Sequence, residues 1–407
     1  MSDTLLLHVP VPLYRRDGQF LLEDQACNGL RLWADHFDRI LLLAPLVDGP
    51  APPSWAALTR VGPALERIEV VTVPQAYRPD RFLRALPAGI PLIRGLIERA
   101  DYLGFAIGGL FGDWGAVGAT IAQRMGKPYY IWTDRVESEV TRRTASSLPW
   151  RRRLRATLEH RPMAWLERQL IRRAALGLFH GSETFEAYAP HCVNPQMVHD
   201  VHVCRSDHIS LQAMADKCAE VENGPLKIVY AGRADAMKGA DDWLDTLEAL
   251  EARGVDFQAR WLGDGPALDT MRRRVAAGPL AARVELTGFV TERASVLQSL
   301  QAAHLMLFCH KTPESPRCLI EALVSGCPIV GYDGAYARDL ISLHQGGVLV
   351  PGQNPQALAD SVLGLVRDRA ALKGLIGAAA RDGARFDDVS VFAHRAALIK
   401  ENLPRAR

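Results

Sequence analysis

The sequence predicts an α/β protein of two doubly wound, Rossmann-like parallel-sheet domains that face a cleft. The chain has 407 residues, 48% of them hydrophobic and 23% charged, which suits about two soluble globular domains. Short continuous apolar runs alternate with amphipathic segments, the pattern of parallel strands covered by helices on both faces. The alternation forms two series, separated by a polar stretch, and each series predicts one domain.

The predicted elements follow this alternation in order. The first series predicts strands at 4–11, 39–46, 68–73, 102–108, 129–134 and 176–181. The second predicts strands at 227–232, 257–265, 284–290, 304–310, 328–334 and 347–351. Amphipathic helices are predicted between the strands, among them 241–253 and 355–366, and a further helix is predicted at the C-terminal end.

The domain boundaries come from the polar segment 209–223, which ends in Asn-Gly-Pro, a turn signal. We place the junction in this segment. The predicted domains are an N-terminal domain, 1–208, and a C-terminal domain, 225–385. The terminal helix, within 386–407, is a candidate to pack back on the N-terminal domain.

Composition excludes several classes of protein. The formal net charge of +2 is too small to indicate a nucleic-acid partner. The longest apolar run starts at Ile40 and falls far short of the ~20 residues of a membrane-spanning helix. Seven cysteines without a Cys-x-x-Cys pair predict reduced thiols and a cytoplasmic protein. Cys309, Cys318 and Cys327 are nine residues apart, but they lack the close pairing typical of a metal site.

A strand that runs into a helix carries the first site prediction. The run at 304–310 reads as a buried strand, and a helix follows, with Ser315 at its N-cap, Pro316 in its first turn and Gly326 at its end. A helix N-terminus at the carboxyl edge of a parallel sheet is a natural anion site, and Arg317 adds a donor and a charge.

Two glutamates flank this predicted anion site. Glu314 lies in the loop before the helix, and Glu321 lies about two turns into it. Carboxylates accept hydrogen bonds from hydroxyls, so a ligand with a central phosphate and hydroxyl-bearing rings at both ends fits the layout. A nucleotide-sugar is such a ligand. The alternative is that both glutamates are ordinary solvated surface residues.

Neighbouring loops add parts of a diphosphate site. Gly232, Arg233 and Lys238 directly follow the strand 227–232, and two cations with a glycine at the end of a strand suit a diphosphate. Gly263 begins a tight turn after the next strand, and Gly288 with Phe289 can present backbone groups to a base. Each loop taken singly also reads as an ordinary turn.

Taken together, these residues resemble the donor half of a retaining glycosyltransferase of family 4, with the GT-B fold. The resemblance covers about 227–366 and rests on five motifs in the family's order, "GR…KG", "LGDGP", "TGFV", "E…LIEALVSGCPIVGYDG" and "GGVLVPGQNPQALADSV". It implies transfer of a sugar from a nucleotide-sugar to an acceptor, with retention at the anomeric carbon. The C-terminal domain, 225–385, would then bind the nucleotide-sugar donor, and the N-terminal domain, 1–208, would bind the acceptor. UDP-sugars are the favoured donors and GDP-sugars come next.

The resemblance also implies roles for single residues. Arg233 and Lys238 correspond to the pair that stabilises the leaving diphosphate, and Glu321 to the glutamate that holds the ribose hydroxyls. The first glutamate of the family's pair stands where this chain has Pro313, so Glu314 comes one residue late. The remaining donor-side candidates are Gly18, Gly232, Gly263, Gly288, Phe289, Ser315, Arg317 and Cys318.

The N-terminal half resembles the family only in outline. Gly18 stands where the family has a glycine loop facing the donor phosphates. No residue is assigned to the histidine that many members place near the sugar. Asp113, Asp134, Glu137 and His180 are acceptor-side candidates, and helix capping, surface pairing and a structural histidine are the alternatives.

The chemistry implied by the family needs no obligatory metal or other cofactor. No Asp-x-Asp stands at a predicted strand end, and fixed cations can stabilise the charge that develops on the leaving diphosphate. Retention without an evident enzyme nucleophile suggests a front-face mechanism, in which the leaving phosphate helps to deprotonate the acceptor.

A basic segment between the two series suggests a partner. Residues 135–173 contain eleven arginines and four glutamates, a net charge of +7 by subtraction, and tryptophans and leucines are interleaved at 150–173. Such a segment suits an anionic membrane surface at the inner leaflet, and hence a glycan or lipid-linked acceptor. A solvated helix packed on the domain core is the alternative, and a nucleic-acid site is disfavoured because no recognition motif accompanies it.

Three other functions compete with a transferase that builds surface polysaccharide or glycolipid. One is a glycosyltransferase for a soluble small molecule, such as a secondary metabolite. A nicotinamide dehydrogenase is suggested by Gly112, Gly115 and Gly118, but it would need GxGxxG after a first strand. The third is a non-catalytic two-domain protein that binds nucleotides or sugars.

Overall fold

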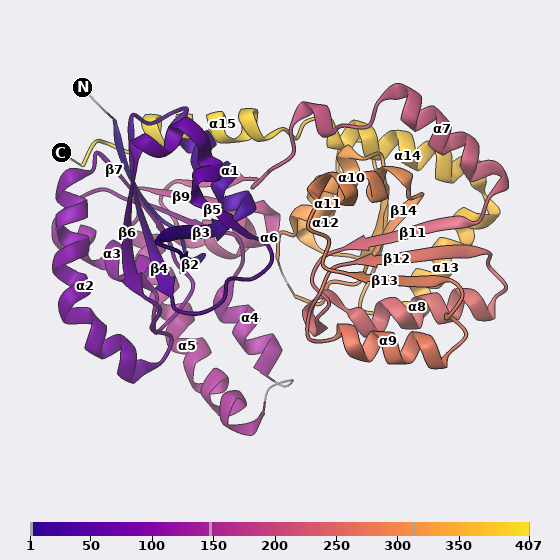
Figure 1. The fold of residues 1–407 in the computed structure, drawn as a ribbon, viewed down its shortest axis with the longest axis horizontal. Coiled ribbons are helices and arrows are strands. Elements are labelled where there is room, and N and C mark those ends of the chain that lie inside the picture. The colour runs from indigo at the N-terminus through magenta and orange to yellow at the C-terminus, as the bar shows by residue number, and fades with distance from the viewer. Residues whose placement is uncertain (1–2, 146–148, 313, 407) are drawn as a thin grey trace. The chain divides into compact units, whose positions relative to one another are not determined.

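The computed structural model describes residues 3–145, 149–312 and 314–406, and the chain forms two compact units (Figure 1). Unit 1 comprises residues 1–202 and 388–407, and unit 2 comprises residues 203–387. Each unit is an α/β domain with a largely parallel sheet. The prediction of an α/β protein with two parallel-sheet domains is confirmed.

Unit 2 is built from strands that alternate with helices. Its strands are β11 (Leu226–Ala231), β12 (Phe257–Leu262), β13 (Val284–Gly288), β14 (Leu305–Phe308), β15 (Ile329–Tyr332) and β16 (Gly347–Val350). Its helices are α7 (Leu211–Asn223), α8 (Ala240–Ala252), α9 (Leu268–Ala277), α10 (Arg293–Ala302), α11 (Arg317–Val324), α12 (Ala335–Leu340), α13 (Pro355–Arg367) and α14 (Arg369–Gly383), with short 3-10 turns η4 (Arg205–Asp207) and η5 (Ala236–Lys238).

The sheet of unit 2 has the strand order β13-β12-β11-β14-β15-β16, and its strands are parallel. Strand order reverses between β11 and β14, which pair directly through Ile228 and Leu305. In open α/β sheets ligands bind outside the carboxyl ends of the strands at such a switch point. The topology of unit 2 therefore selects the loops after β11 and β14 as its binding site.

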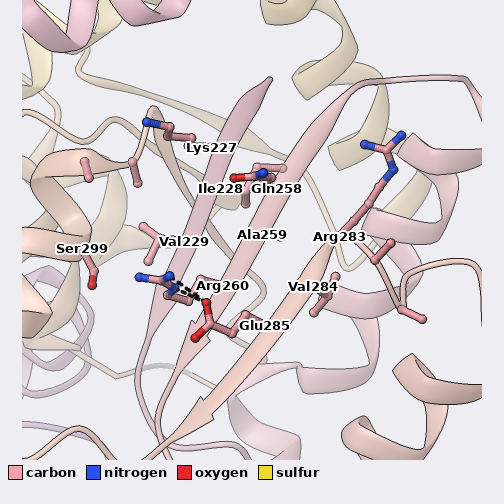
Figure 2. A pocket seen from close by; sticks show the side chains of 14 residues that line it. Lys227, Ile228, Val229, Gln258, Ala259, Arg260, Arg283, Val284, Glu285 and Ser299 are labelled. Carbon is pink, nitrogen blue, oxygen red and sulfur yellow. Dashed lines mark hydrogen bonds and ion pairs between the residues drawn. The ribbon is translucent and has the colours of Figure 1, made fainter. Parts of the chain in front are cut away.

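Unit 2 also has a hollow at the other end of its sheet (Figure 2). The hollow is about 460 Å³ and is lined by the first halves of β11, β12 and β13 and by the end of α10. Among its lining residues, the guanidinium of Arg260 on β12 pairs with the carboxylate of Glu285 on β13, 2.7 Å away. Because the lining residues come from the amino-terminal halves of parallel strands, this hollow lies away from the switch-point loops.

Unit 1 has more strands than its predicted series. They are β1 (Thr4–His8), β2 (Leu13–Arg16), β3 (Gln19–Glu23), β4 (Arg39–Val47), β5 (Trp55–Ala57), β6 (Ile68–Pro74), β7 (Tyr102–Ala106), β8 (Tyr130–Thr133), β9 (Leu176–His180) and β10 (Pro195–Val198). The helices are α1 (Asp24–Ala34), α2 (Pro79–Arg99), α3 (Trp114–Arg124), α4 (Glu137–Thr144), α5 (Trp150–Arg173), α6 (Gly181–Tyr188) and α15 (Asp388–Asn402), with 3-10 turns η1 (Leu58–Arg67) and η3 (Ala189–His191).

The sheet of unit 1 is parallel along the path β10-β9-β8-β7-β1-β4, and β6 pairs with β4. The strands β2, β3 and β5 extend it as an antiparallel ribbon that the sequence analysis did not predict. The segment after β1 is thus a hairpin, turned by Asp17 (φ +50°) and Gly18 (φ +77°). Both residues take positive φ values, as a tight two-residue hairpin turn requires.

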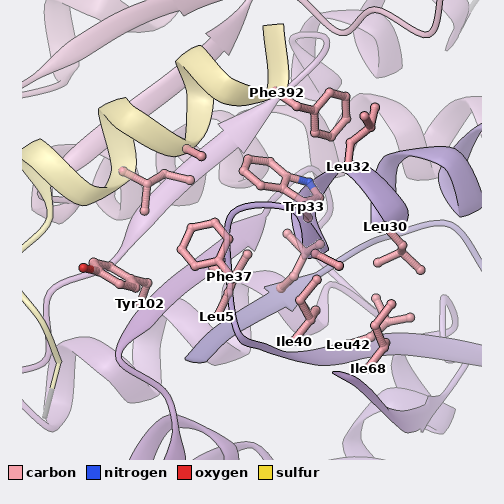
Figure 3. Packing of buried hydrophobic residues seen from close by; sticks show 14 of the residues in the cluster. Leu5, Leu30, Leu32, Trp33, Phe37, Ile40, Leu42, Ile68, Tyr102 and Phe392 are labelled. Carbon is pink, nitrogen blue, oxygen red and sulfur yellow. The ribbon is translucent and has the colours of Figure 1, made fainter. Parts of the chain in front are cut away.

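The core of unit 1 explains why its strands are continuously apolar. Leu5 and Leu7 of β1 pack into one hydrophobic cluster, and Leu6 packs into the cluster on the opposite face. Side chains alternate between faces along a strand, so both faces must be apolar when helices cover both. The terminal helix α15 belongs to this unit, because Phe392 packs on Trp33 of α1 with ring centroids 5.2 Å apart (Figure 3).

We placed the domain junction in the polar segment 209–223. In the structure this segment forms the helix α7 of unit 2. The chain passes from unit 1 to unit 2 earlier, between His202 and Val203. Ser210 caps this helix by accepting a hydrogen bond from the backbone N–H of Ala213. The buried ammonium of Lys217 donates to the carbonyls of Leu300, Ser325 and Gly326. Its burial gives the polar segment a packing role that hydropathy alone does not indicate.

Candidate active site

The loops after β11 and β14 meet at the switch point of unit 2. The Nζ of Lys238 lies 2.7 Å from Oε1 of Glu314, and the two side chains are only 15% and 11% exposed. The backbone N–H of Lys311 donates to the carbonyl of Met237, 2.8 Å away, and joins the loops a second time. The structure therefore brings together two of the three residues predicted for catalysis.

A glycine sets the distance between these loops. Gly239 follows Lys238 with φ +69°, and a Cβ built on it would lie 2.1 Å from the carbonyl oxygen of Cys309. Only a residue without a side chain fits such a close approach of two backbones. The Oδ1 of Asp235 accepts from the N–H of Lys238, 3.1 Å away, and caps the turn η5. Lys238 is thus held in place by its own loop as well as by Glu314.

Arg233, the third predicted catalytic residue, lies on the surface beside this pair. Its side chain is mostly exposed, and its Nε is 3.7 Å from Oδ2 of Asp235. An exposed contact of this length constrains the guanidinium little. Arg233 is placed in the same loop as Lys238, and its guanidinium can turn toward an anionic ligand.

The floor under this loop consists of residues that the sequence analysis missed. The hydroxyl of Tyr230 shares a 2.8 Å hydrogen bond with Nε2 of His310, and burial lowers the pKa of His310 well below its usual value. The indole N–H of Trp261 donates to the carbonyl of Gly232, 3.1 Å away. Tyr230 and Trp261 are the second-last residues of β11 and β12. The sequence feature that could have indicated them is an aromatic residue close to a glycine loop.

The next two loops converge on the same sheet edge. The N–H of Gly263 donates to the carbonyl of Gly288 over 2.9 Å, and a Cβ on Gly263 would lie 2.0 Å from the carbonyl oxygen of Gly232. Phe289 is exposed directly after β13. The predicted backbone contacts to a base therefore lie on neighbouring loops, at the carboxyl ends of β11, β12 and β13.

The helix α11 differs from its prediction at its start. It begins at Arg317 with Pro316 in the N-cap position, instead of with Ser315 as its cap, and Ser315 is buried. Proline fixes φ and has no N–H, so it suits the entry of a helix. The predicted donor-side residues Arg317, Cys318 and Glu321 all lie on this helix and are partly exposed. Pro313 lies outside the described residues.

The acceptor-side candidates of unit 1 separate into two kinds. Asp113 is the N-cap of α3, and its carboxylate accepts from the N–H groups of Gly108, Gly109 and Ala116. His180 is buried at the end of β9 and accepts from the N–H of Asp200. Both residues have structural roles that account for them.

Glu137 and Asp134 are different, because they lie near the carboxyl end of β8 without a capping role. Asp134 is exposed. The Oε1 of Glu137 pairs with Nε of Arg135 over 2.6 Å, and burial nevertheless raises the pKa of Glu137 to about 7. A carboxyl group that titrates near neutral pH is a functional candidate.

His8 was not singled out from the sequence. It ends β1, and its Nδ1 lies 3.0 Å from the carbonyl of Ala106, so Nδ1 carries the proton and Nε2 is left as an acceptor. Burial lowers the pKa of His8 to about 4, which keeps the ring neutral at physiological pH. The sequence feature that could have indicated His8 is a polar residue at the carboxyl end of the first parallel strand.

Gly18 turns the hairpin between β2 and β3, and nothing lies within 4 Å of a Cβ built on it. The turn alone accounts for glycine at this position.

Among the described residues, no group of three or more His, Cys, Asp or Glu side chains could hold a metal ion. Burial raises the pKa of Cys318 and Cys327 to about 12, which keeps these thiols protonated. In the part of the chain that is described, no helix is both long and apolar enough to cross a membrane.

The segment that contains these loops matches a known family. Residues 225–368 match the sequence model of the glycosyl transferases group 1. This segment is therefore similar to that family. It contains the whole set of loops after β11, β12, β13 and β14 described above.

Curated proteins to which this chain is similar include enzymes with different acceptors. The chain is 26% identical over 211 residues to the alpha-D-kanosaminyltransferase of Streptomyces kanamyceticus, covering 50% of this chain and 54% of the relative. It is 27% identical over 141 residues to a GDP-mannose-dependent alpha-(1-6)-phosphatidylinositol dimannoside mannosyltransferase of Mycobacterium tuberculosis, covering 35% of each chain. The matches thus span about half, or less, of these relatives.

Solved structures match over the whole chain. The Anabaena protein Alr3699/HepE, solved in complex with UDP, has a TM-score of 0.68 and 18% identity, and the match covers 98% of this chain and 100% of that one. The same protein has been solved with UDP-glucose. At this identity the likeness shows the fold.

Proposed function

We propose that this protein transfers a sugar from a nucleoside-diphosphate sugar to an acceptor hydroxyl with retention of the anomeric configuration, as a family 4 enzyme. The observation that carries the proposal is the meeting of the β11 and β14 loops, which puts Lys238 against Glu314 at the switch point of a group 1 domain. A fixed, shielded cation at this position suits the diphosphate of a donor.

The proposed step needs charge stabilisation at the leaving group. The acceptor oxygen attacks the anomeric carbon on the face from which the diphosphate departs. The bond from the anomeric carbon to the phosphate oxygen breaks, its electron pair stays on that oxygen, and the same oxygen takes the acceptor's proton. Lys238 and Arg233 stabilise the charge that grows on the diphosphate, in place of a metal ion.

The remaining donor-side residues take positioning and recognition roles in this proposal. Glu314 orients Lys238 through their 2.7 Å contact and faces the donor sugar. Glu321 accepts from the ribose hydroxyls, and the loop at Gly288 and Phe289 meets the base. A uracil base is favoured because a neighbour of the same fold binds UDP, and guanine comes next because a relative is GDP-mannose-dependent.

The acceptor is proposed to be a glycan or lipid-linked molecule of surface polysaccharide or glycolipid synthesis. The mannosyltransferase relative, whose acceptor is named as a phosphatidylinositol dimannoside, supports this class. A soluble secondary-metabolite acceptor is the second candidate, supported by the kanosaminyltransferase relative. Asp134, Glu137 and His8 are the proposed acceptor-side residues of unit 1.

Thermal stabilisation by a panel of nucleoside diphosphates tests the donor half. At about 100 times its Kd, a ligand adds roughly 2.7 kcal/mol of stability, which moves the melting temperature by several degrees. We expect UDP or GDP to stabilise the wild type and Arg233→Ala to lose most of the shift. Arg260→Ala, at the opposite end of the sheet, is the matched control and should keep it. A chain stabilised only by a nicotinamide dinucleotide would contradict the proposal.

Turnover separates the enzyme from a binding protein. With the donor that gives the shift, product formation on lipid-linked and soluble acceptors is measured, and the anomeric configuration of the product is read by NMR. An inverted product would overturn retention, and tight donor binding without turnover of any acceptor would favour a non-catalytic protein.

A further inference from the structure

The outer face of α5 has no role in the proposed reaction. Four of its large apolar side chains are exposed: Trp150 by 71%, Leu154 by 55%, Leu158 by 66% and Trp165 by 64%. At about 100° per residue, these positions fall within about 80° of one another on the helix. They form one stripe along the helix, which we call the α5 stripe.

The opposite face of α5 is anchored in unit 1. Its buried residues include Met163, Leu170 and Ile171. Glu167, also buried, accepts from the N–H and hydroxyl of Ser138 and from the hydroxyl of Tyr188 at 2.7–3.1 Å. These contacts fix the rotation of the helix about its axis, and the α5 stripe therefore faces away from the core of unit 1.

Arginines surround the α5 stripe. Within the described part of the chain, α5 carries eight exposed arginines: Arg151, Arg152, Arg153, Arg155, Arg161, Arg168, Arg172 and Arg173. Of the two glutamates of this helix, Glu159 pairs with Arg155 over 2.7 Å and Glu167 is buried. The guanidinium of Arg151 lies 5.1 Å from the ring centre of Trp150. The face is thus apolar and strongly cationic at once.

We propose that the α5 stripe docks on the surface of an anionic lipid bilayer. Trp side chains favour the boundary between headgroups and acyl chains, while arginines keep their charge at lipid phosphates and lay their stems along apolar surface. An acidic protein would offer charge for the arginines, but it would also need a surface shaped to fit four apolar side chains spread along the helix. A fluid surface meets them all without such shaping.

The inference goes beyond the proposed reaction and does not depend on it, since it concerns where the protein lies. It is compatible with a lipid-linked acceptor, because unit 1 would then meet the bilayer that carries that acceptor. Binding to the bilayer and binding to the donor are measured separately, so failure of one leaves the other standing.

Sedimentation with vesicles tests the inference on the full chain. Vesicles of phosphatidylcholine alone are compared with vesicles containing about 30% phosphatidylglycerol, at low and high salt. We expect binding to the anionic vesicles, weakened by salt because exposed charges are screened. The triple variant Trp150→Ala/Leu158→Ala/Trp165→Ala should lower the partition coefficient about tenfold or more, since it removes the inserted apolar groups.

Matched variants make the result specific. Leu83→Ala on α2 and Leu211→Ala on α7 remove equally exposed apolar side chains elsewhere and should leave vesicle binding unchanged. Arg161→Gln/Arg168→Gln should reduce binding and its dependence on salt. Circular dichroism and the melting temperature check that each variant is folded.

Three outcomes would overturn the inference. One is a wild type that does not sediment with anionic vesicles. Another is a triple variant that binds as the wild type does. The third is that the α5 stripe contacts a second copy of the chain. Light scattering would then show a dimer for the wild type and a monomer for the triple variant, and the two proteins would bind vesicles equally.

Discussion

The ammonium of Lys238 and the carboxylate of Glu314 form a shielded 2.7 Å ion pair between two loops that are 76 residues apart in the chain. The pair exists because β11 and β14 are neighbours at the switch point of the unit 2 sheet. The pair holds a cation at the sheet edge to which the proposed function assigns the donor diphosphate.

Lys238→Met should lower kcat/KM for the donor by about 10²–10³, because it removes a fixed cation from the leaving group. Lys227→Met is the matched control. Lys227 lies at the start of β11 and pairs with the exposed Glu220, so its replacement should leave kcat/KM nearly unchanged. Initial rates at several donor concentrations give both values. Equal losses in the two variants would indicate a general effect of charge.

Glu314→Gln should lower the rate less than Lys238→Met does, and the double variant should be no worse than Lys238→Met alone. The reason is that Glu314 acts largely through the cation that it orients. A double-mutant cycle measures the coupling, which for groups in contact amounts to roughly 0.5–3 kcal/mol. Additive losses would mean that Glu314 acts independently of Lys238.

Gly239→Ala should destabilise unit 2 by more than about 1 kcal/mol, because alanine at φ +69° is strained and its Cβ would meet the carbonyl of Cys309. Gly364→Ala is the control, since Gly364 lies within α13 with open space around it and should gain roughly 0.5–1 kcal/mol. Urea unfolding gives both values. A neutral Gly239→Ala would show that the two loops can separate.

Glu137 should make stability depend on pH between about 4.5 and 7. Its pKa is raised from 4.5 to about 7 in the folded state, so the folded protein binds the proton more tightly than the unfolded chain does. Stability from this group is therefore full below pH 4.5 and is lost as pH rises to 7, by an amount on the order of 3 kcal/mol. Glu137→Gln should remove this loss.

The measurement is urea unfolding of both proteins at pH 5 and pH 7.5. Only the difference between wild type and variant is informative, because His8 and His304 titrate with lowered pKa values in both proteins and act in the opposite sense. The variant should gain stability relative to the wild type as pH rises. A constant difference would place the pKa of Glu137 near its ordinary value.

The residues of unit 2 that could be predicted from the sequence are those whose roles are local. Glycines 232, 263 and 288 stand directly after apolar runs, so the ends of β11, β12 and β13 were readable from neighbouring residues. The hydrogen bond between Tyr230 and His310 could not be predicted, because it joins residues 80 positions apart. The same holds for Lys217, whose three acceptors lie on other segments of unit 2.

In unit 1, the hairpin of β2 and β3 is likewise a feature that neighbouring residues alone do not predict. The stretch containing Gly18 reads as a loop after the first strand, yet β2 and β3 pair across it and join β4. Short polar strands at a sheet edge carry too little hydrophobic pattern to be recognised locally, since their pairing partner supplies the stability.

The sequence by itself determined the alternation of buried strands and helices, the doubly wound class of both units and the positions of the glycine loops, because each depends on side chains within a few residues of one another. Only the tertiary structure decided which loops meet. Lys238 pairs with Glu314, α15 packs on α1, and the boundary between the two units lies before α7. Each of these depends on strand order and packing, which bring segments distant in the chain together. The resulting burial shifts the pKa values of the buried groups and shields the paired charges from solvent.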